Sequence, residues 1–263
     1  MRLVIVDANS WVRVKMESER PQDFIRGILN LTGTNALIFR VWVWDGYKGN
    51  DARRALFPRY KSRPPSNPDI MKNLNFVREL IGLTNSWQVQ IPGFEGDDVV
   101  AALTKHFVDT TDYPITIAAR DGDLAALRCL APTRITCEYT GKIQHDLVRL
   151  YKAYVGDQSD TIPGLKGFGD GAWEKADKVA LQKILDAVRA DPSQPVNEEQ
   201  CLAAGISKAS VTWLSSQENR TEWAIMARII EPLPIPHDVL HGHLKQGTDD
   251  PAALMEMMKR YML

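Results

Sequence analysis

Short apolar runs that alternate with amphipathic segments constrain the fold of this chain more than any other feature. Runs typical of buried strands are found at residues 3–6, 36–44, 88–91, 115–119 and 134–139. Apolar residues at helical spacing lie between them, at residues 21–31, 68–83 and 95–108. Because strands and helices that alternate in units of this length form parallel crossovers, the sequence predicts an α/β fold with a parallel sheet.

The second half of the chain lacks such runs. Helical patterns are found at residues 146–154, over much of 172–230 and at 251–262, with an extended connector at 232–236. A Gly- and Asp-rich segment, residues 156–171, follows the first of these helices. We therefore expect no strand after about residue 145. The expected organisation is an α/β domain over residues 1–145 and a helical region over residues 146–263.

Composition excludes several classes of protein. Of the 263 residues, 44% are hydrophobic and 25% are charged, as in an ordinary soluble globular protein. The apolar stretch after Arg2 is too short for a signal peptide, and no stretch is long enough to span a membrane. Three cysteines without a CxxC pair indicate a reducing compartment. We expect a protein of a reducing cytoplasm with no membrane partner.

Acidic residues follow the predicted strands. Asp7, Asp45, Glu95 and Asp121 come at or just after the ends of four of these strands. Ligands bind outside the carboxyl ends of the strands in an open parallel sheet, so these side chains are expected to converge on one crevice. Five further carboxylates lie beside them in the sequence or form an Asp-x-x-Asp pair: Asp97, Asp98, Asp123, Asp157 and Asp160.

Carboxylates at this density need a counter-charge, because like charges in one pocket force each other to protonate. Hard divalent cations supply it, and an all-oxygen ligand set favours Mg²⁺ or Mn²⁺ over zinc. Each acid taken alone is explained as well by helix capping, and Glu95, Asp97 and Asp98 suit the start of a helix. Capping does not explain four strand ends and two further acidic pairs together. The sequence therefore predicts a divalent metal site.

A basic segment, KGNDARRALFPRYKSR at residues 48–63, begins just after the second predicted strand. The whole chain is nearly neutral, with 32 Lys and Arg against 33 Asp and Glu, so its charges are segregated along the sequence. A charged run is often only a solvated helix face. Here it leaves the predicted crevice and carries Phe57 and Tyr60, and cations interleaved with aromatic rings are typical of phosphodiester binding.

Glycines at alternating positions form the third feature, within IPGLKGFG at residues 162–169. Such a turn lets backbone N–H groups approach a phosphate closely at the start of a helix. Three histidines, His237, His241 and His243, have a spacing that could bind zinc. No HExxH frame is present and a Pro-rich connector precedes them, so the sequence does not favour a metal site there.

Together these segments resemble the ordered motifs of the 5′-nucleases. The resemblance covers roughly residues 1–180 and rests on six segments: VDANS at 6–10, WDG at 44–46, RRALFPRYKSRPP at 53–65, GFEGDDVVAAL at 93–103, ARDGDLAAL at 119–127 and GDQSDTIPGLKGFG at 156–169. The family includes flap endonucleases, the 5′→3′ exonuclease domain of bacterial DNA polymerase I, and phage exonucleases with ribonuclease H-type activity. The resemblance implies a PIN-like parallel sheet flanked by helices and a helical arch at about residues 48–72. It also implies a helix–three-turn–helix, a helix-hairpin-helix-like DNA-binding motif, at about residues 155–180.

The resemblance also implies roles for individual residues. A first metal ion would be held by Asp7, Asp45, Glu95, Asp97 and Asp98, and a second, partly through water, by Asp121, Asp123, Asp157 and Asp160. The residues expected to carry catalysis are Lys61, Arg53, Asp7, Asp97 and Asp98. Those expected to bind DNA are Arg53, Arg54, Tyr60, Lys61, Arg63, Gly164, Lys166, Gly167 and Gly169. Lys61 would touch the scissile phosphate, Tyr60 would stack on or orient the terminal nucleotide, and the glycine turn would also bind a monovalent K⁺.

The chain departs from the family pattern in two places. Asp170 and Gly171 stand where the family often has Lys, so Lys166 or Lys175 would have to supply that phosphate contact. The arch segment at residues 63–68 is short and Pro-rich, as in the polymerase I type. The length suits a free-standing, phage-encoded enzyme that has no polymerase domain of its own.

The function predicted is hydrolysis of phosphodiesters in DNA with a 5′ end, flap or nick, and in RNA–DNA hybrids. A replication polymerase or a single-strand binding protein would act with it in trans. Two alternatives remain open at this point. A PIN-type ribonuclease shares the acidic strand ends but does not require the Ile-Pro-Gly turn. A non-catalytic DNA-junction binder would have lost metal ligands, whereas all nine positions are acidic in this chain.

Overall fold

The computed structural model describes residues 1–18, 26–28, 37–62 and 68–262. The chain forms two compact units. Unit 1 contains residues 1–49, 64–140 and 233–263, and unit 2 contains residues 50–63 and 141–232. The helix predicted at 21–31 lies mostly outside the described residues, as does part of the predicted arch segment.

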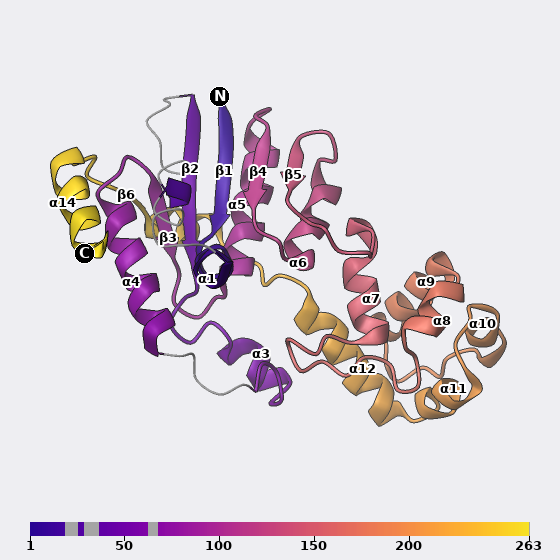
Figure 1. Ribbon diagram of the computed structural model, residues 1–263. Coiled ribbons are helices and arrows are strands. Elements are labelled where there is room, and N and C mark those ends of the chain that lie inside the picture. Colours follow the sequence, from indigo (N-terminus) through magenta and orange to yellow (C-terminus); the bar gives the residue numbers. More distant parts are fainter. Residues whose placement is uncertain (19–25, 29–36, 63–67, 263) are drawn as a thin grey trace. The chain divides into compact units, whose positions relative to one another are not determined.

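Unit 1 is built on a six-stranded sheet with the order β5-β4-β1-β2-β3-β6 (Figure 1). Its strands are β1 (Arg2–Asp7), β2 (Ile38–Trp44), β3 (Trp87–Gln90), β4 (Ile115–Ala118), β5 (Ile135–Cys137) and β6 (Leu244–Gln246). The first five run parallel, and β6 pairs antiparallel with β3. Because parallel strands end at the same edge, Asp7 in β1 lies opposite Val43 near the end of β2. The predicted parallel α/β sheet is confirmed.

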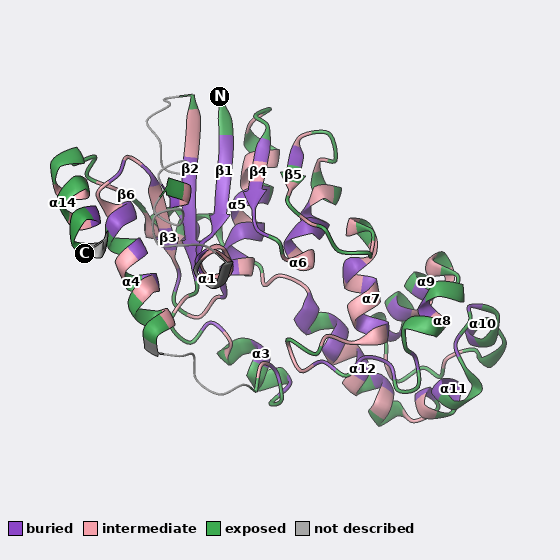
Figure 2. Cartoon of the chain, viewed as in Figure 1, coloured by how far each residue is buried: buried purple, intermediate pink, exposed green. Residues whose placement is uncertain are grey.

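Both faces of this sheet are covered by helices. Leu3 and Ile5 of β1 pack on one face, and Val4 and Val6 pack on the other, so the strand is apolar at every position between its ends. Figure 2 shows β1 and β2 buried along most of their length. One face carries α1 (Ala8–Ser18), α4 (Pro68–Gly82) and α14 (Pro251–Met262). The other carries α5 (Gly96–Thr110), α6 (Gly122–Ala125), the 3₁₀ helix η1 (Ala126–Leu130) and α13 (His237–His243).

Unit 2 is helical in its described residues. It contains α3 (Asp51–Leu56), the 3₁₀ helix η2 (His145–Leu147), α7 (Val148–Val155), α8 (Asp170–Lys175), α9 (Lys178–Ala190), α10 (Glu198–Ala203), α11 (Lys208–Leu214) and α12 (Gln217–Ile230). Its core is centred on the buried Tyr154 and Trp223, whose rings meet edge to face. The polar atoms of both rings are satisfied, because Trp223 Nε1 donates to the Ala153 carbonyl and Tyr154 Oη donates to the Leu181 carbonyl.

The structure differs from the sequence prediction at the C-terminal end of the chain. The expectation of no strand after residue 145 is wrong, because β6 adds to the open edge of β3. Residues 233–263, predicted to belong with the helical region, pack in unit 1, whereas residues 50–63 pack in unit 2. The three residues of β6, Leu-Lys-Gln, have no apolar periodicity, so the pairing depends on the exposed edge rather than on their own pattern. None of the helices in the described part of the chain combines the length and the apolar character that a membrane crossing requires.

Candidate metal and phosphate site

The acidic residues of unit 1 stand at the ends of parallel strands and at the beginnings of α1, α5 and α6, the elements labelled in Figure 1. Asp7 closes β1, is only 6% exposed, and accepts a hydrogen bond from the Ser10 backbone N–H in the first turn of α1. Asp45 follows β2 and accepts from the Gly96 N–H (2.8 Å) and from the side-chain amide of Asn9 (2.8 Å). A Cβ at position 96 would lie 3.0 Å from Oδ1 of Asp45 and 3.9 Å from Oδ1 of Asp7. Two strand ends and the start of α5 therefore converge, as predicted.

The start of α5 is held by two further acids of the predicted set. Glu95 is the N-cap residue, and Glu95 and Asp98 form a capping box in which each side chain accepts from the backbone N–H of the other. Asp98 is fully buried, and its second oxygen accepts from the Leu233 N–H at 2.7 Å. Both oxygens of Asp98 are thus satisfied by backbone donors. The structure gives Asp98 a structural role, joining α5 to the segment at which the chain re-enters unit 1.

Three other acids of unit 1 are half-buried: Asp97, Asp121 and Asp123. Asp97 lies in the first turn of α5, where the positive end of the helix dipole favours a carboxylate. Asp121 caps α6 and accepts from the Asp123 N–H at 2.9 Å. The helices α5 and α6 contact each other, so these three acids belong to one edge of the unit.

Unit 2 has its own pair of acids, Asp157 and Asp160, whose carboxylate oxygens approach within 4.8 Å of each other. Asp157 sits in a tight turn, accepting from the backbone and hydroxyl of Ser159, and forms an ion pair with Lys152 at 2.7 Å. Burial acts to raise the pKa of Asp157, but the Lys152 ammonium and the Ser159 hydrogen bonds outweigh burial and hold the pKa below its usual value. Asp157 is therefore a carboxylate at neutral pH.

Lys61 lies beside Asp160. Its backbone N–H donates to the Asp160 carbonyl at 3.0 Å, and its Nζ is 3.7 Å from Asp160 Oδ1, with both side chains less than one-fifth exposed. Lys61 adopts a left-handed backbone conformation with φ 47°, which Arg54 supports by donating to the carbonyls of Tyr60 and Lys61. The structure thus places Lys61 beside Asp160, one of the predicted metal ligands.

Arg53 and Tyr60 do not lie as the sequence predicted. Arg53 is 3% exposed and donates to the carbonyls of Ile229 and Glu231 at the end of α12, so the structure does not place it where it could touch a phosphate. Tyr60 is also 3% exposed, with its ring in the core of unit 2, and its hydroxyl donates to Asp160 at 3.5 Å. A buried ring has no open face on which a nucleotide could stack. Arg63 lies outside the described residues.

The glycine turn links α7 to α8. Gly164 has φ 70°, and a Cβ there would lie 2.5 Å from the Gly156 backbone nitrogen, so only glycine fits. Gly167 also has a left-handed conformation, with φ 80°, whereas Gly169 is extended and caps α8. Lys166, Gly167 and Gly169 are exposed, and Gly164 is buried. The exposed part of the turn is open to a ligand, while Gly164 allows the chain to fold back on α7.

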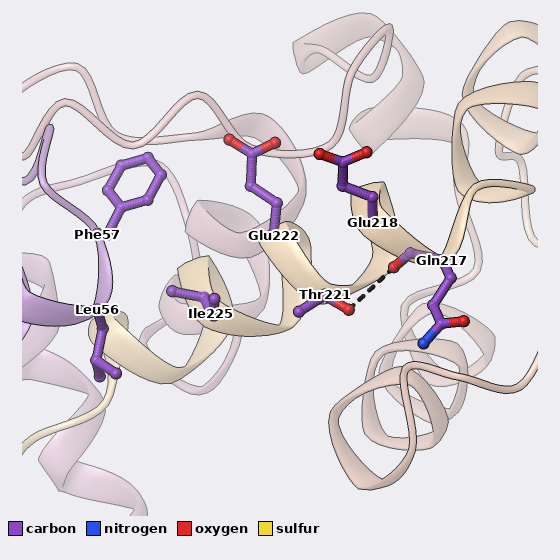
Figure 3. Close-up of a pocket in the computed structure, with 7 residues that line it drawn as sticks. All are labelled: Leu56, Phe57, Gln217, Glu218, Thr221, Glu222 and Ile225. Carbon is purple, nitrogen blue, oxygen red and sulfur yellow. Dashed lines mark hydrogen bonds between the residues drawn. The ribbon is translucent and has the colours of Figure 1, made fainter.

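A separate groove of about 570 Å³ lies between α3 and α12 in unit 2 (Figure 3). None of the predicted site residues lines it. Its lining consists of Leu56, Phe57, Gln217, Glu218, Thr221, Glu222 and Ile225. The residues that line the groove include two carboxylates and no cation, so this groove is not a candidate for a nucleic-acid strand.

Sequence reasoning missed two groups that shape the site. Asn9 exchanges hydrogen bonds with Asp45, because its amide accepts from the Asp45 N–H and donates to the Asp45 carboxylate. Lys152 neutralises Asp157 from the preceding helix. The signal for Lys152 was present, since a cation on the last turn of a helix five residues before an Asp can reach back to it. Asn9 stands within the VDANS motif but was not assigned a role.

The donor set fits a hard divalent cation. All the predicted ligands, in unit 1 and in unit 2, are Asp or Glu and offer only carboxylate oxygens. These are the ligands that Mg²⁺ and Mn²⁺ prefer. Asp98, with both oxygens used by the backbone, is the member of the set that fits least.

Comparison with known proteins identifies the family. The model of the 5′-3′ exonuclease N-terminal, resolvase-like domain matches residues 17–154, just over half of the chain. The chain belongs to this 5′-3′ exonuclease family. It is 31% identical to DNA polymerase I of Caldicellulosiruptor bescii over 146 residues, which are 49% of this chain and 17% of that polymerase. It is 27% identical to a 5′-3′ exonuclease of Aquifex aeolicus over 56% of this chain and 54% of that protein. The chain thus spans less than a fifth of the polymerase and about half of the exonuclease.

The fold is shared over the whole length with a solved structure. The D15 protein of bacteriophage T5, co-crystallised with metal ions, has a TM-score of 0.60 at 17% identity, with 100% of this chain and 98% of that chain covered. A variant described as a flap endonuclease, in complex with DNA and metal ions, has a TM-score of 0.53 at 16% identity, with 98% of this chain and 100% of that chain covered. This likeness confirms the predicted fold class of a central sheet flanked by helices.

The two neighbouring acids of α5 allow a matched test of their roles. In Asp98→Asn, one of the two oxygens becomes an NH₂ group, which cannot accept a hydrogen bond from the backbone N–H that faces it. We therefore expect a loss of about 1–3 kcal/mol of stability. That loss corresponds to a melting temperature lower by roughly 2–10 °C in excess EDTA. Asp97→Asn removes one of several clustered negative charges and should leave the melting temperature unchanged or raise it. A clear loss of stability for Asp97→Asn alone would show that Asp97, and not Asp98, is the structural acid.

The ion pair between Lys152 and Asp157 makes a second prediction. The two side chains are only 15% and 10% exposed, so Lys152→Met leaves a largely buried carboxylate without its cation. We expect a stability loss of about 2 kcal/mol or more in urea unfolding at pH 7 with EDTA. The control is Lys105→Met, which breaks the exposed pair with Asp109 and should cost less than about 0.5 kcal/mol. Equal losses for the two variants would contradict the assignment.

Proposed function

We propose that this chain is a metal-dependent, structure-specific 5′-nuclease that hydrolyses phosphodiesters in DNA with a 5′ end, flap or nick. The observation that carries the proposal is the convergence of Asp7, Asp45 and the start of α5 at the carboxyl edge of the sheet. Family membership supports the reaction class, and the likeness to the T5 structures supports the fold.

We propose that carboxylates of both units hold two Mg²⁺ or Mn²⁺ ions. In unit 1 these are Asp7, Asp45, Glu95, Asp97, Asp121 and Asp123, with Asp98 acting through its tie to the backbone. In unit 2 they are Asp157 and Asp160. These carboxylates would hold the ions, which would supply activation of a water molecule and stabilisation of the leaving oxygen.

The chain's own residues position the phosphate. Asp160 accepts from the Lys61 backbone and lies beside its ammonium, and Tyr60 holds the other oxygen of the same carboxylate. Lys61 is thereby held in a fixed conformation, and we propose that its ammonium contacts a phosphate that enters beside Asp160. A cation fixed in advance stabilises the charge that develops in the transition state at little reorganisation cost. We assign Tyr60 and Arg54 to positioning Lys61, and the buried Tyr60 does so in place of the nucleotide contact predicted for it.

We propose that the glycine turn binds the DNA duplex. Gly167, Gly169 and the exposed Lys166 present backbone and cationic groups where α8 begins. We also propose that this turn binds a monovalent K⁺. Backbone phosphates do not distinguish DNA from RNA strongly, so RNA–DNA hybrids are proposed as further substrates. We further propose that the protein acts in the bacterial cytoplasm, with a replication polymerase or single-strand binding protein in trans.

Cleavage of three labelled substrates in Mg²⁺ tests the function: a 5′ flap, a nicked duplex and single-stranded RNA. We expect cleavage near the 5′ end of the DNA substrates, loss of activity in excess EDTA and recovery with Mn²⁺, because only oxygen donors are offered. Asp7→Asn should abolish cleavage, whereas Asp109→Asn, an exposed acid far along α5, should not.

Three outcomes would contradict the proposal. Preference for single-stranded RNA would indicate a PIN-type ribonuclease. Tight binding of the flap without cleavage would indicate a junction binder. Full turnover in excess EDTA would exclude the metal-dependent mechanism.

A further inference from the structure

Three imidazoles meet on unit 1, apart from the acids that the proposed function uses. His106 lies on α5, and His237 and His241 lie on α13, one helical turn apart. The ring centroids of His106 and His237 are 4.6 Å apart, and those of His237 and His241 are 5.1 Å apart. The sequence spacing grouped His237 and His241 with His243. In the structure their neighbour is instead His106, which lies more than a hundred positions away along the chain.

His243 is engaged elsewhere. Its Nδ1 lies 2.8 Å from the carbonyl of Val239 within its own helix. In the part of the chain that the structure describes, no hydrogen bond or ion pair to the ring nitrogens of His106, His237 or His241 is found. The ring contacts are with one another and with Phe107. Three imidazoles with such surroundings have their nitrogens available to a ligand.

The two ring spacings, between His106 and His237 and between His237 and His241, match those of imidazoles on one tetrahedral metal ion. With metal–nitrogen bonds of about 2.0–2.1 Å, the centroids of two imidazoles on one ion lie about 5 Å apart. The rings are tilted by 46° and 50° rather than stacked. The ring nitrogens do not yet all gather within 4.8 Å of one another, but His237 and His241 are exposed and can rotate toward a common point.

We propose that His106, His237 and His241 form a site for a divalent late transition-metal ion such as Zn²⁺ or Ni²⁺. Imidazole is the preferred ligand of these ions, whereas Mg²⁺ prefers carboxylates, so the site is chemically distinct from the acidic edge. His106 favours the neutral form that a metal needs, because burial and the two neighbouring imidazoles lower its pKa.

Metal binding here would join α5 to α13. The two helices already pack together, with Leu240 of α13 in the same core as Leu103 of α5. Asp98 fixes the same returning segment through Leu233. A metal would therefore add a second link between α5 and residues 233–263, which carry β6 and α14. The ion would act as a structural clamp and would take no part in phosphodiester hydrolysis.

The test is titration of the full chain with Ni²⁺ or Zn²⁺ in about 10 mM Mg²⁺, which competes for the carboxylates. Calorimetry should show one equivalent bound, and a hundredfold excess over Kd should raise the melting temperature by roughly 5–10 °C. His106→Gln, His237→Ala and His241→Ala should each weaken binding by about tenfold or more. His243→Ala is the matched control and should bind as the unaltered chain does.

Two results would overturn the inference. One is Ni²⁺ or Zn²⁺ binding in excess Mg²⁺ that survives all three substitutions, which would place the ion on the carboxylates. The other is no binding by the unaltered chain. Because His237 and His241 are exposed, their replacement does not endanger folding, and circular dichroism in EDTA confirms that each variant is folded.

Discussion

Like charge concentrated at the carboxyl edge of a parallel sheet is the constraint on which the rest of the structure depends. The parallel strands and their following helices bring acids together whether or not those acids repel one another. Hydrogen bonds within the protein stabilise some of these carboxylates. Asp98 is held by two backbone N–H groups, and Asp45 is held by Gly96 and Asn9. Buried or constrained carboxylates are stable only with such partners or with a bound cation.

In unit 2, lysine side chains add to the backbone donors that hold the acids. Lys152 neutralises Asp157 from α7, and Lys61 lies beside Asp160 from the basic segment. Arg53 is buried and does not offer its positive charge to a substrate in the way the sequence suggests. Arg53 closes the end of α12 and Arg54 holds the turn before Lys61. These two arginines of the basic segment therefore stabilise the local structure that holds Lys61 in place.

The sequence pattern of a segment predicted those strands and helices that depend on that segment alone. The short apolar run at residues 3–6 predicted a buried strand that ends at Asp7, and the structure buries it on both faces. Contacts between distant segments could not be predicted in this way. Nothing in Leu-Lys-Gln at β6 indicates pairing with β3, and nothing near His106 indicates His237. The role of Asp98 likewise depends on Leu233, which lies 135 residues away along the chain.

The central claim is that Lys61 acts on the phosphate undergoing reaction, and the separation of rate from affinity for Lys61→Ala tests it most directly. Single-turnover cleavage of a flap substrate should fall by roughly 10²-fold or more, the scale for losing one charge-stabilising group. Affinity measured in Ca²⁺ should change far less, and the slope of log affinity against log salt should fall by no more than about one. Arg59→Ala, which removes an exposed cation paired with Glu222, should leave the rate unchanged. Collapse of affinity with an intact cleavage step would contradict the account and make Lys61 a docking residue.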